Sequence, residues 1–333
     1  MGACGPAEGG LVAEGLDRVA VTGGTGSFGQ AFVRRLLKDG AERIVIVSRD
    51  EVKQGDMQDA LSSPSLRFLL GDVRDRDRMR QCFSGCATVV HAAALKRVSS
   101  VYSQPEMVKT NIFGTMNVIE AALDAGVERV IVISSDKAVE PTNQYGVTKA
   151  AAEGIAVHAN SYTYPQGLAV SVVRYGNVMG SRGSVLEVWA GQHAQRQPLT
   201  ITNPEMSRFL VSLPMACQVV VDAVSMMQGG EIFIPVLPAT TIGKLANALY
   251  GNWPQTVTGI RPGGEKSHES LLSREERTRV HRLTDRLMLI APSFHSWTTD
   301  SYPVETVPEY DSDSINHLGG GALVEWLARE GIG

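Results

Sequence analysis

Two residues suited to acid–base chemistry, Tyr145 and Lys149, stand four positions apart near the middle of the chain. On a helix this spacing places both side chains on one face, where an ammonium charge favours the ionised form of a neighbouring phenol. A phenolate can take the proton of an alcohol while the alcohol carbon loses hydride. Because a Tyr-x-x-x-Lys pattern is common by chance, its interpretation depends on what the rest of the chain builds around it.

A glycine-rich segment near the start of the chain could hold the hydride acceptor. The sequence TGGTGSFG at residues 22–29 follows a predicted strand, opens a predicted helix and fits both GxGxxG and TGxxGxxG. In this context glycines allow a tight turn and let backbone N–H groups approach a pyrophosphate. We therefore predict a dinucleotide site. Its expected residues in this segment are Gly23, Thr25, Gly26, Ser27, Phe28 and Gly29.

The end of the second predicted strand indicates which dinucleotide binds. An NAD enzyme usually offers a carboxylate there to the ribose 2′-hydroxyl, whereas this chain has Ser48 and Arg49 before Asp50. Guanidinium and hydroxyl donors suit a 2′-phosphate, so we predict NADP, and Asp50 keeps NAD open as the alternative. The expected cofactor contacts in the loops after the second, third and fourth strands are Ser48, Arg49, Lys53, Asp72, Val73 and Ala92.

Short β-branched runs alternate with longer amphipathic stretches through the first half of the chain. Phe28, Phe32 and Leu36 recur every four residues, which is the spacing of a helix face. Strands that alternate with such helices predict an α/β fold, a Rossmann-type doubly wound parallel sheet with a smaller C-terminal substrate-binding lobe. The predicted strands are residues 18–22, 43–47, 67–70, 88–91, 130–134 and 169–174.

Composition excludes several classes of protein. The 333 residues are 43% hydrophobic, and 31 basic residues are balanced by 35 acidic ones, which gives no one-signed field for nucleic acid. No apolar stretch has the length of a membrane span or a signal peptide, which predicts a cytoplasmic protein with no membrane partner. Four cysteines without paired ligand spacing predict no metal site.

Composition shifts along the chain predict its domain organisation. We expect a flexible leader over residues 1–16 and an NADP-binding Rossmann domain over residues 17–176. After residue 176, frequent prolines interrupt shorter segments of both kinds. Residues 177–333 are therefore expected to form mainly the substrate-binding lobe, with segments that could return to the Rossmann domain.

Further segments follow the glycine motif in a fixed order. They are SRDEVKQ (48–54), GDVRD (71–75), HAAALKRV (91–98), TNIFGTMNVI (110–119), SSDKAVEPTNQYGVTKA (134–150), RYGNVMGSRGSV (174–185), GGEIFIP (229–235) and IRPGGEKSHE (260–269). Together they resemble the extended short-chain dehydrogenases/reductases that act on nucleotide sugars. Within that superfamily the chain is most similar to the inverting UDP-N-acetylglucosamine 4,6-dehydratases of the pseudaminic-acid pathway type, in the CapD-like polysaccharide biosynthesis family.

This resemblance implies a lyase reaction that uses a hydride cycle. Tyr145 would deprotonate the sugar 4-hydroxyl as hydride leaves C4. Lys137 would then remove the C5 proton and Asp136 would protonate the departing 6-hydroxyl, which requires a neutral Lys137 and a protonated Asp136. Ser135 would set its hydroxyl against the substrate, and Lys149 would also hold the nicotinamide ribose. In the inverting branch the C5 proton returns from the opposite face.

The resemblance also implies substrate contacts and assembly. UDP-N-acetylglucosamine is the expected substrate, and a homo-oligomer, dimeric or larger, is the expected assembly. The chain departs from its relatives after Arg261, where it inserts a glycine and has serine in place of leucine, so the exact sugar and nucleotide stay open. The implied substrate contacts are Lys96 near the sugar, Asn177 at the diphosphate, and Arg208, Arg261 and Glu265 at the uridine diphosphate end.

Three alternatives remain at this point. The first is a 4- or 5-epimerase, which keeps the cofactor chemistry and stops at the ketone. The second is a dehydratase of a different sugar nucleotide. The third is a non-catalytic NADP-binding sensor, a class in which no working tyrosine–lysine pair is expected.

Overall fold

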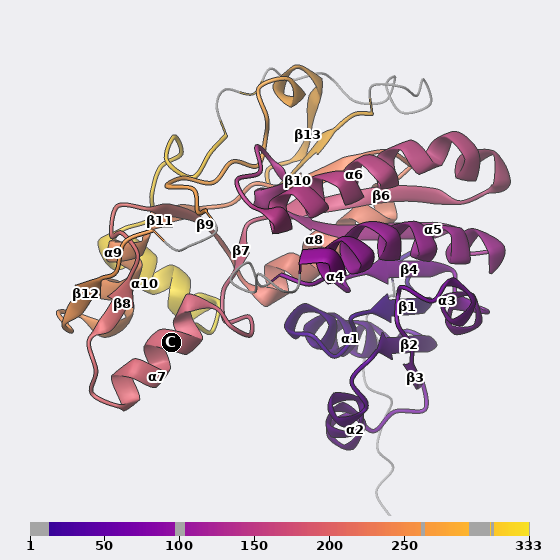
Figure 1. The fold of residues 1–333 in the computed structure, drawn as a ribbon, viewed down its shortest axis with the longest axis horizontal. Coiled ribbons are helices and arrows are strands. Elements are labelled where there is room, and N and C mark those ends of the chain that lie inside the picture. Colours follow the sequence, from indigo (N-terminus) through magenta and orange to yellow (C-terminus); the bar gives the residue numbers. More distant parts are fainter. Residues whose placement is uncertain (1–12, 97–103, 261–263, 293–306, 308–309, 333) are drawn as a thin grey trace, which may run out of the picture.

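A nine-stranded sheet crosses the computed structural model, which describes residues 13–96, 104–260, 264–292, 307 and 310–332 (Figure 1). Among these residues the strand order is β13-β14-β10-β6-β5-β4-β1-β2-β3. Neighbours from β10 to β3 pair in parallel, and β14 and β13 add an antiparallel edge. The strands are β1 (Arg18–Thr22), β2 (Arg43–Ser48), β3 (Leu66–Leu70), β4 (Thr88–His91), β5 (Arg129–Ser135), β6 (Ala169–Tyr175), β10 (Ile232–Pro235), β13 (Val280–Thr284) and β14 (Leu287–Ile290).

The central strands are runs of valine and isoleucine because both of their faces are covered. Such runs are typical of a parallel sheet between two helical layers. The interior residues of β1, β2 and β5 are buried throughout. The six strands expected from the sequence lie within one residue of the observed bounds at either end. The predicted doubly wound α/β fold is therefore confirmed.

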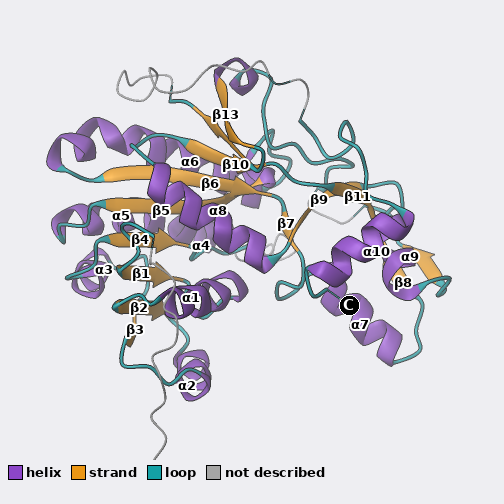
Figure 2. Cartoon of the chain, turned by 180° about the vertical axis from the view of Figure 1, so that it is seen from behind, coloured by secondary structure: helices purple, strands orange, loops and turns teal. Residues whose placement is uncertain are grey.

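Helices cover both faces of the sheet (Figure 2). The contacts of α5 with α3 and α6 place these three helices in one layer, and α1 packs beside α8 in the other. A parallel pair of strands requires such crossover connections. The helices of these layers are α1 (Ser27–Asp39), α2 (Glu51–Ala60), α3 (Arg76–Phe83), α4 (Gln104–Val108), α5 (Gly114–Asp124), α6 (Gln144–Thr163) and α8 (Leu213–Met226).

A second, smaller core lies beyond the carboxyl ends of the central strands (Figure 1). Trp189, Leu210 and Trp326 are among its buried residues. Because β10, β14 and β13 return to the main sheet from this half of the chain, the domain split at residue 176 stays a prediction. The elements of this lobe are β7 (Asn177–Val178), α7 (Val185–Ala194), β8 (Leu199–Ile201), β9 (Ser207–Val211), β11 (Ala239–Thr241), α9 (Ile242–Tyr250), β12 (Gln255–Val257) and α10 (Gly320–Arg329).

The junction between β5 and α6 brings the two predicted catalytic segments together. A single 3-10 turn, η3 (Asp136–Ala138), follows β5 directly. The side chain of Asn143 then caps α6 by accepting a hydrogen bond from the Gly146 backbone N–H at 3.0 Å. A Cβ on Gly146 would overlap the Lys137 carbonyl oxygen. The first turn of α6 therefore packs against η3 only because residue 146 has no side chain.

We expect Gly146→Ala to destabilise the protein by about 1–3 kcal/mol, because the added methyl group forces η3 and α6 apart. Gly154→Ala is the matched control, since it lies in the same helix with open space around its Cα. That change is expected to raise the free energy of unfolding by about 0.5–1 kcal/mol through helix propensity. Urea unfolding of the three proteins measures both effects. Equal stability changes in the two variants would contradict the packing argument.

Candidate active site

A cavity of about 680 Å³ opens at the carboxyl ends of β1, β2 and β3. Its wall is formed by the predicted cofactor loops, including Ala93 and Ala94 in the run of small residues expected after β4, and by Thr110, which was not predicted as a cofactor contact. Of the predicted cofactor residues, Ser27, Phe28 and Gly29 of the glycine segment do not line this cavity, and neither do Tyr145 and Lys149 of α6. The predicted residues that line the cavity are Gly23, Thr25, Gly26, Ser48, Arg49, Lys53, Asp72, Val73 and Ala92.

The glycine loop packs closely against its own backbone and against the loop after β4. Gly23 has φ 67°, and a Cβ there would lie 2.8 Å from the Ala93 backbone nitrogen. A Cβ on Gly29 would lie 2.6 Å from the Gly23 carbonyl oxygen, so the glycine is needed for α1 to start next to the loop. The backbone N–H groups at this helix start can therefore approach a pyrophosphate. These residues fit a dinucleotide.

Phe28 and Ser27 hold the glycine loop in place. The Phe28 ring stacks on Phe32 with centroids 5.5 Å apart and contacts Tyr175 at the end of β6. The Ser27 hydroxyl oxygen accepts a hydrogen bond from the Arg182 backbone N–H at 2.9 Å. The segment after β7 is thereby tied to the start of α1.

Charged side chains of both signs lie at the end of β2. The Asp50 carboxylate caps α2 and pairs with Lys53, and its pKa is lowered by hydrogen bonds from the Lys53 side chain and backbone, with a smaller effect of the Arg182 charge. Arg49 is half-exposed and lies 3.5 Å from Asp72. Lys53 and the start of α2 already bond Asp50, and the Arg49 guanidinium, which makes one 3.5 Å hydrogen bond with Asp72, can offer its other N–H groups to a ligand.

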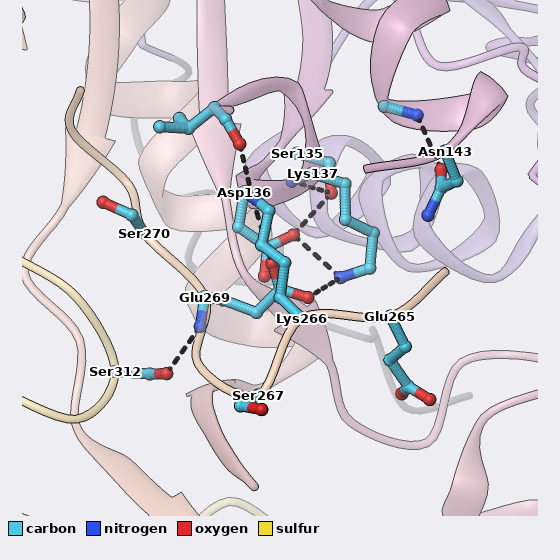
Figure 3. Close-up of polar contacts among 12 residues, drawn as sticks. Ser135, Asp136, Lys137, Asn143, Glu265, Lys266, Ser267, Glu269, Ser270 and Ser312 are labelled. Carbon is cyan, nitrogen blue, oxygen red and sulfur yellow. Dashed lines mark hydrogen bonds and ion pairs between the residues drawn. The ribbon is translucent and has the colours of Figure 1, made fainter. Parts of the chain in front are cut away.

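Ser135, Asp136 and Lys137 form one hydrogen-bonded group at the end of β5 (Figure 3). The Ser135 hydroxyl donates to Asp136 Oδ1 at 2.7 Å, and Lys137 Nζ donates to the same oxygen at 3.0 Å. Asp136 is fully buried, and its Oδ2 has no hydrogen-bond partner among the described residues. Lys137 Nζ also lies 3.2 Å from Glu269 Oε1. One oxygen of Asp136 thus stays available for a ligand.

The protonation of this group differs from what the mechanism needs at its start. Burial by itself lowers the pKa of Lys137, but the charges of Asp136 and Glu269 outweigh burial and raise it above its usual value. Lys137 is therefore held as an ammonium between carboxylates in the ligand-free protein, and the neutral amine that the expected mechanism needs at least transiently must form from it. Burial and the nearby Asp136 charge raise the pKa of Glu269. The pKa of Lys137 is raised in part by this second carboxylate, Glu269, which the sequence analysis did not connect with Lys137.

Tyr145 and Lys149 both start from the first two turns of α6, as their spacing predicts. Lys149 is buried and its Nζ donates to the Ile133 carbonyl oxygen at 2.5 Å. Burial lowers the pKa of Lys149 to about 8. Burial also raises the pKa of Tyr145, against the charge of Lys137 and a hydrogen bond with Ser135. The cation that eases ionisation of the phenol here is Lys137, which differs from the expected influence of Lys149.

The predicted substrate residues lie in the smaller lobe and at its edge. Asn177 Oδ1 in β7 is buried without a hydrogen-bond partner among the described residues, so it can accept a bond from a ligand. Lys96 keeps an exposed side chain. The Arg208 guanidinium in β9 donates to Glu265 Oε1 at 3.0 Å and to the Ser267 carbonyl oxygen at 3.0 Å. Arg208 and Glu265 therefore meet each other, and Arg261 lies outside the described residues.

Three residues of the site were missed by the sequence analysis. Lys266 and Glu269 belong to a segment that it quoted, but nothing in their spacing links them to Lys137, about 130 positions earlier. Asn111, in the π-helical turn η2 (Lys109–Phe113), bonds the Leu95 backbone N–H at 2.8 Å. Its amide also donates to Thr148 Oγ1 at 3.0 Å, which joins the loop after β4 to α6. Only the folded chain brings these residues to the site.

Two kinds of feature are absent from the described ranges. Within residues 13–96, 104–260, 264–292 and 310–332, no three His, Cys, Asp or Glu side chains are grouped so that they could hold a metal ion. Across the same part of the chain, no helix combines the length and the apolar character needed to cross a membrane.

Comparison with known proteins identifies the family. Residues 19–291 match the family model described as polysaccharide biosynthesis protein. The chain belongs to this family. It is 39% identical over 304 residues to a UDP-N-acetylglucosamine 4,6-dehydratase (inverting) of Campylobacter jejuni, covering 90% of this chain and 87% of that one. It is also 43% identical to a UDP-glucose 4-epimerase of Rickettsia conorii, covering 80% of each chain. The predicted family is confirmed.

Solved structures share the fold. The X-ray structure of Pen from Bacillus thuringiensis superposes with a TM-score of 0.87 at 31% identity and covers 95% of this chain and 98% of that one. DesIV, a dTDP-glucose 4,6-dehydratase from Streptomyces venezuelae with NAD and TYD bound, has a TM-score of 0.67 at 25% identity, covering 74% of this chain and 86% of that one. The predicted nicotinamide cofactor site is supported at this level.

The buried Lys149 predicts a pH-dependent stability. Its pKa is about 8 in the folded chain, against 10.5 when it is solvated. Between these values the unfolded chain binds more protons, so the free energy of unfolding rises with pH. Relative to Lys149→Met, the wild type should gain on the order of 2 kcal/mol from pH 8 to pH 10.5.

Chemical denaturation at several pH values measures this difference. Lys244→Met serves as the control, because Lys244 is exposed on α9. The difference between wild type and the control variant should not change over the same range. A constant difference for Lys149→Met as well would show that its amine is solvated in the folded protein.

Proposed function

We propose that this protein is an NADP-dependent nucleotide-sugar 4,6-dehydratase. Its proposed substrate is UDP-N-acetylglucosamine, and inversion at C5 would give UDP-2-acetamido-2,6-dideoxy-β-L-arabino-hex-4-ulose. The observation that carries the proposal is the ion pair between the buried Asp136 and the partly exposed Lys137, beside Tyr145 at the end of β5. The similarity to a 4,6-dehydratase over most of the chain supports it.

Each step assigns one proton transfer to a side chain of this site. Tyr145 takes the proton of the 4-hydroxyl as C4 is oxidised. When bound at the glycine loop, a nicotinamide cofactor accepts hydride from C4 and later returns it to C6. The ketone acidifies the C5 proton, and Lys137 removes it. Asp136, through its Oδ2, which has no partner among the described residues, protonates the departing 6-hydroxyl, so that the C6–O bond breaks and water leaves. As hydride returns to C6, a solvent proton adds to C5 from the opposite face, and Tyr145 releases its proton to solvent, so that one substrate gives one product and one water.

The contact between Lys137 and Asp136 accounts for how both catalysts are reset. After elimination Lys137 holds the C5 proton and Asp136 has lost its own, which is the ion pair seen in this structure. A net transfer of one proton from Lys137 to Asp136, with the proton ending on Oδ2, restores the neutral amine and the carboxylic acid and leaves Oδ1, 3.0 Å from Nζ, to accept an N–H of the amine. The neutral amine and the carboxylic acid together carry the same number of protons as the ion pair.

The electrostatics at the end of β2 favour NADP over NAD. A 2′-phosphate placed beside Arg49 would meet a half-exposed guanidinium, with Lys53 and Arg182 near by. The carboxylate that could accept a ribose hydroxyl, Asp50, is occupied by Lys53.

The cytoplasmic location and the homo-oligomeric assembly expected from the sequence remain proposals.

A 4-epimerase is the second candidate, because a UDP-glucose 4-epimerase is among the similar proteins. An epimerase that acts only at C4 needs a base for the 4-hydroxyl and the cofactor. It needs neither an acid for the 6-hydroxyl nor a base for C5. The burial of Asp136 with one free oxygen beside Lys137 therefore favours dehydration.

Incubation of the protein with UDP-N-acetylglucosamine in D2O, first alone and then with NADP+, tests the reaction. We expect a product lighter by the mass of one water, with deuterium at C5 and L-arabino configuration by NMR. A product of unchanged mass would identify an epimerase. Absence of any reaction across a panel of sugar nucleotides would overturn the proposal and favour the non-catalytic sensor.

Tyr145→Phe is the matched variant for this experiment, because it removes one hydroxyl and keeps the ring. We expect conversion to fall by at least about 100-fold with cofactor binding retained, since the base for the 4-hydroxyl is lost. If Tyr145→Phe converted the substrate at the wild-type rate, the catalytic assignment of Tyr145 would be wrong.

Arg49→Ala tests the choice of cofactor. We expect the Kd for NADP+ to rise about ten-fold through loss of a charge-assisted contact to the 2′-phosphate, while the Kd for NAD+ stays unchanged. Arg34→Ala, on the exposed side of α1, is the control for overall charge. Calorimetric titration with both nucleotides measures the effect. Tighter binding of NAD+ than NADP+ by the wild type would contradict the prediction.

A further inference from the structure

A second carboxylate, Glu269, contacts the proposed base Lys137. Glu269 lies on the loop of residues 264–270, and its Oε1 is 3.2 Å from Lys137 Nζ (Figure 3). Only 3% of the Glu269 side chain is exposed, and Lys266 Nζ lies 3.7 Å from its other oxygen. A buried carboxylate is costly unless it is paired, so this placement needs an explanation.

Several contacts fix Glu269 in this position. The Ser312 hydroxyl accepts a hydrogen bond from the Glu269 backbone N–H at 2.9 Å, and the Ser312 backbone N–H donates to the Glu269 carbonyl oxygen at 2.7 Å. Ser312 in turn bonds the hydroxyl of Ser207 in β9 at 2.7 Å. Arg208, the next residue, holds the carbonyl oxygens of the same loop. The carboxylate is thus held by the smaller lobe, whereas Lys137 belongs to the main sheet.

The geometry has a consequence for a neutral Lys137. A neutral amine has two N–H groups and one lone pair. Asp136 Oδ1 and Glu269 Oε1, at 3.0 and 3.2 Å, can accept both N–H groups. Lys137 is the one member of this trio with an exposed portion, 27% of its side chain. The lone pair is then left on the open side, where a substrate can approach.

We propose that Glu269 is a positioning residue for Lys137: its carboxylate turns the lone pair of the neutral amine toward the substrate and stabilises the ammonium formed when the amine takes the C5 proton. This inference rests on the proposed dehydratase function. As the C5–H bond breaks, the new N–H bond forms on Lys137, and the positive charge develops 3.2 Å from Glu269. Charge placed beforehand where charge develops lowers the barrier.

The charge environment gives the direction of the pH effect. The charges of Asp136 and Glu269 raise the pKa of Lys137, against burial and the charge of Arg208. Loss of the Glu269 charge must therefore lower the pKa of Lys137. The titratable and charged groups around Lys137 and its partner Glu269 are Asp136, Tyr145, Lys96, Arg208 and Lys266.

Glu269→Gln is the variant that tests this role, because the amide keeps an acceptor and removes the charge. Glu325→Gln, on the exposed face of α10, is the matched control. The first measurement uses ligand-free protein: labelling of Lys137 by an amine-reactive reagent as a function of pH, read by peptide mass spectrometry. We expect the labelling midpoint to move down by about one pH unit or more in Glu269→Gln and to stay in place in the control.

The second measurement separates two steps of the reaction. In Glu269→Gln we expect C5 deuterium exchange to fall by about ten- to a hundred-fold, with the pH at which it rises moved downward. Oxidation at C4, followed by the absorbance of the reduced nicotinamide in a single turnover, should stay near the wild-type rate. A merely structural role would slow both steps together and leave the pH profile in place.

The outcomes distinguish this inference from the proposed function. A wild type that exchanges no C5 proton in any sugar nucleotide would overturn the function, while the labelling midpoint would still report on the Glu269 contact. An unchanged midpoint together with unchanged exchange would overturn the positioning role. If Glu269→Gln fails to fold, Glu269→Asp keeps the charge on a shorter stem. The pH midpoint of Lys137 labelling in Glu269→Asp should then lie between the wild-type midpoint and the usual pKa of a lysine. A wild-type rate of C5 exchange in Glu269→Asp would contradict the inference.

Discussion

The ion pair between Asp136 and Lys137 is the contact on which the rest of the site depends. Two charges at the end of a buried strand are tolerated only when each has a partner, because the loss of their hydration is costly. Asp136 is fully buried and finds Ser135 and Lys137, and Lys137 finds Glu269 as well. A proton can then pass between Lys137 and Asp136 without changing the net charge of the site.

The parallel sheet makes this arrangement possible. The carboxyl ends of β1, β2, β4 and β5 meet along one edge, so the glycine loop, the cofactor cavity and η3 are neighbours even though about 110 residues separate the first from the last. Strands buried on both faces cannot shift register without exposing apolar side chains. The main sheet therefore supplies a rigid support for the cofactor and for Tyr145.

The smaller lobe contributes the other half of the site through loops. Arg208 holds the loop at residues 265–267 by its carbonyl oxygens, and Ser207 and Ser312 hold Glu269. A second link joins the Arg182 backbone N–H to Ser27 at the glycine loop. The predicted substrate residues on one lobe are in this way tied to the predicted cofactor residues on the other, which suits the proposed reaction, in which hydride leaves one sugar carbon and returns to another.

The sequence by itself determined the doubly wound fold, the six strands of its first half and the local groups whose members are close along the chain. Gly23 to Gly29, Ser135 to Lys137, and Tyr145 with Lys149 belong to such groups, because strand and helix periodicities fix the neighbours of residues a few positions apart. The tertiary structure alone decided that Glu269 meets Lys137 and that Asn111 joins the loop after β4 to α6. It also decided the protonation of Lys137, since a pKa depends on burial and on charges brought together from distant parts of the chain. No spacing rule in one sequence encodes those distances.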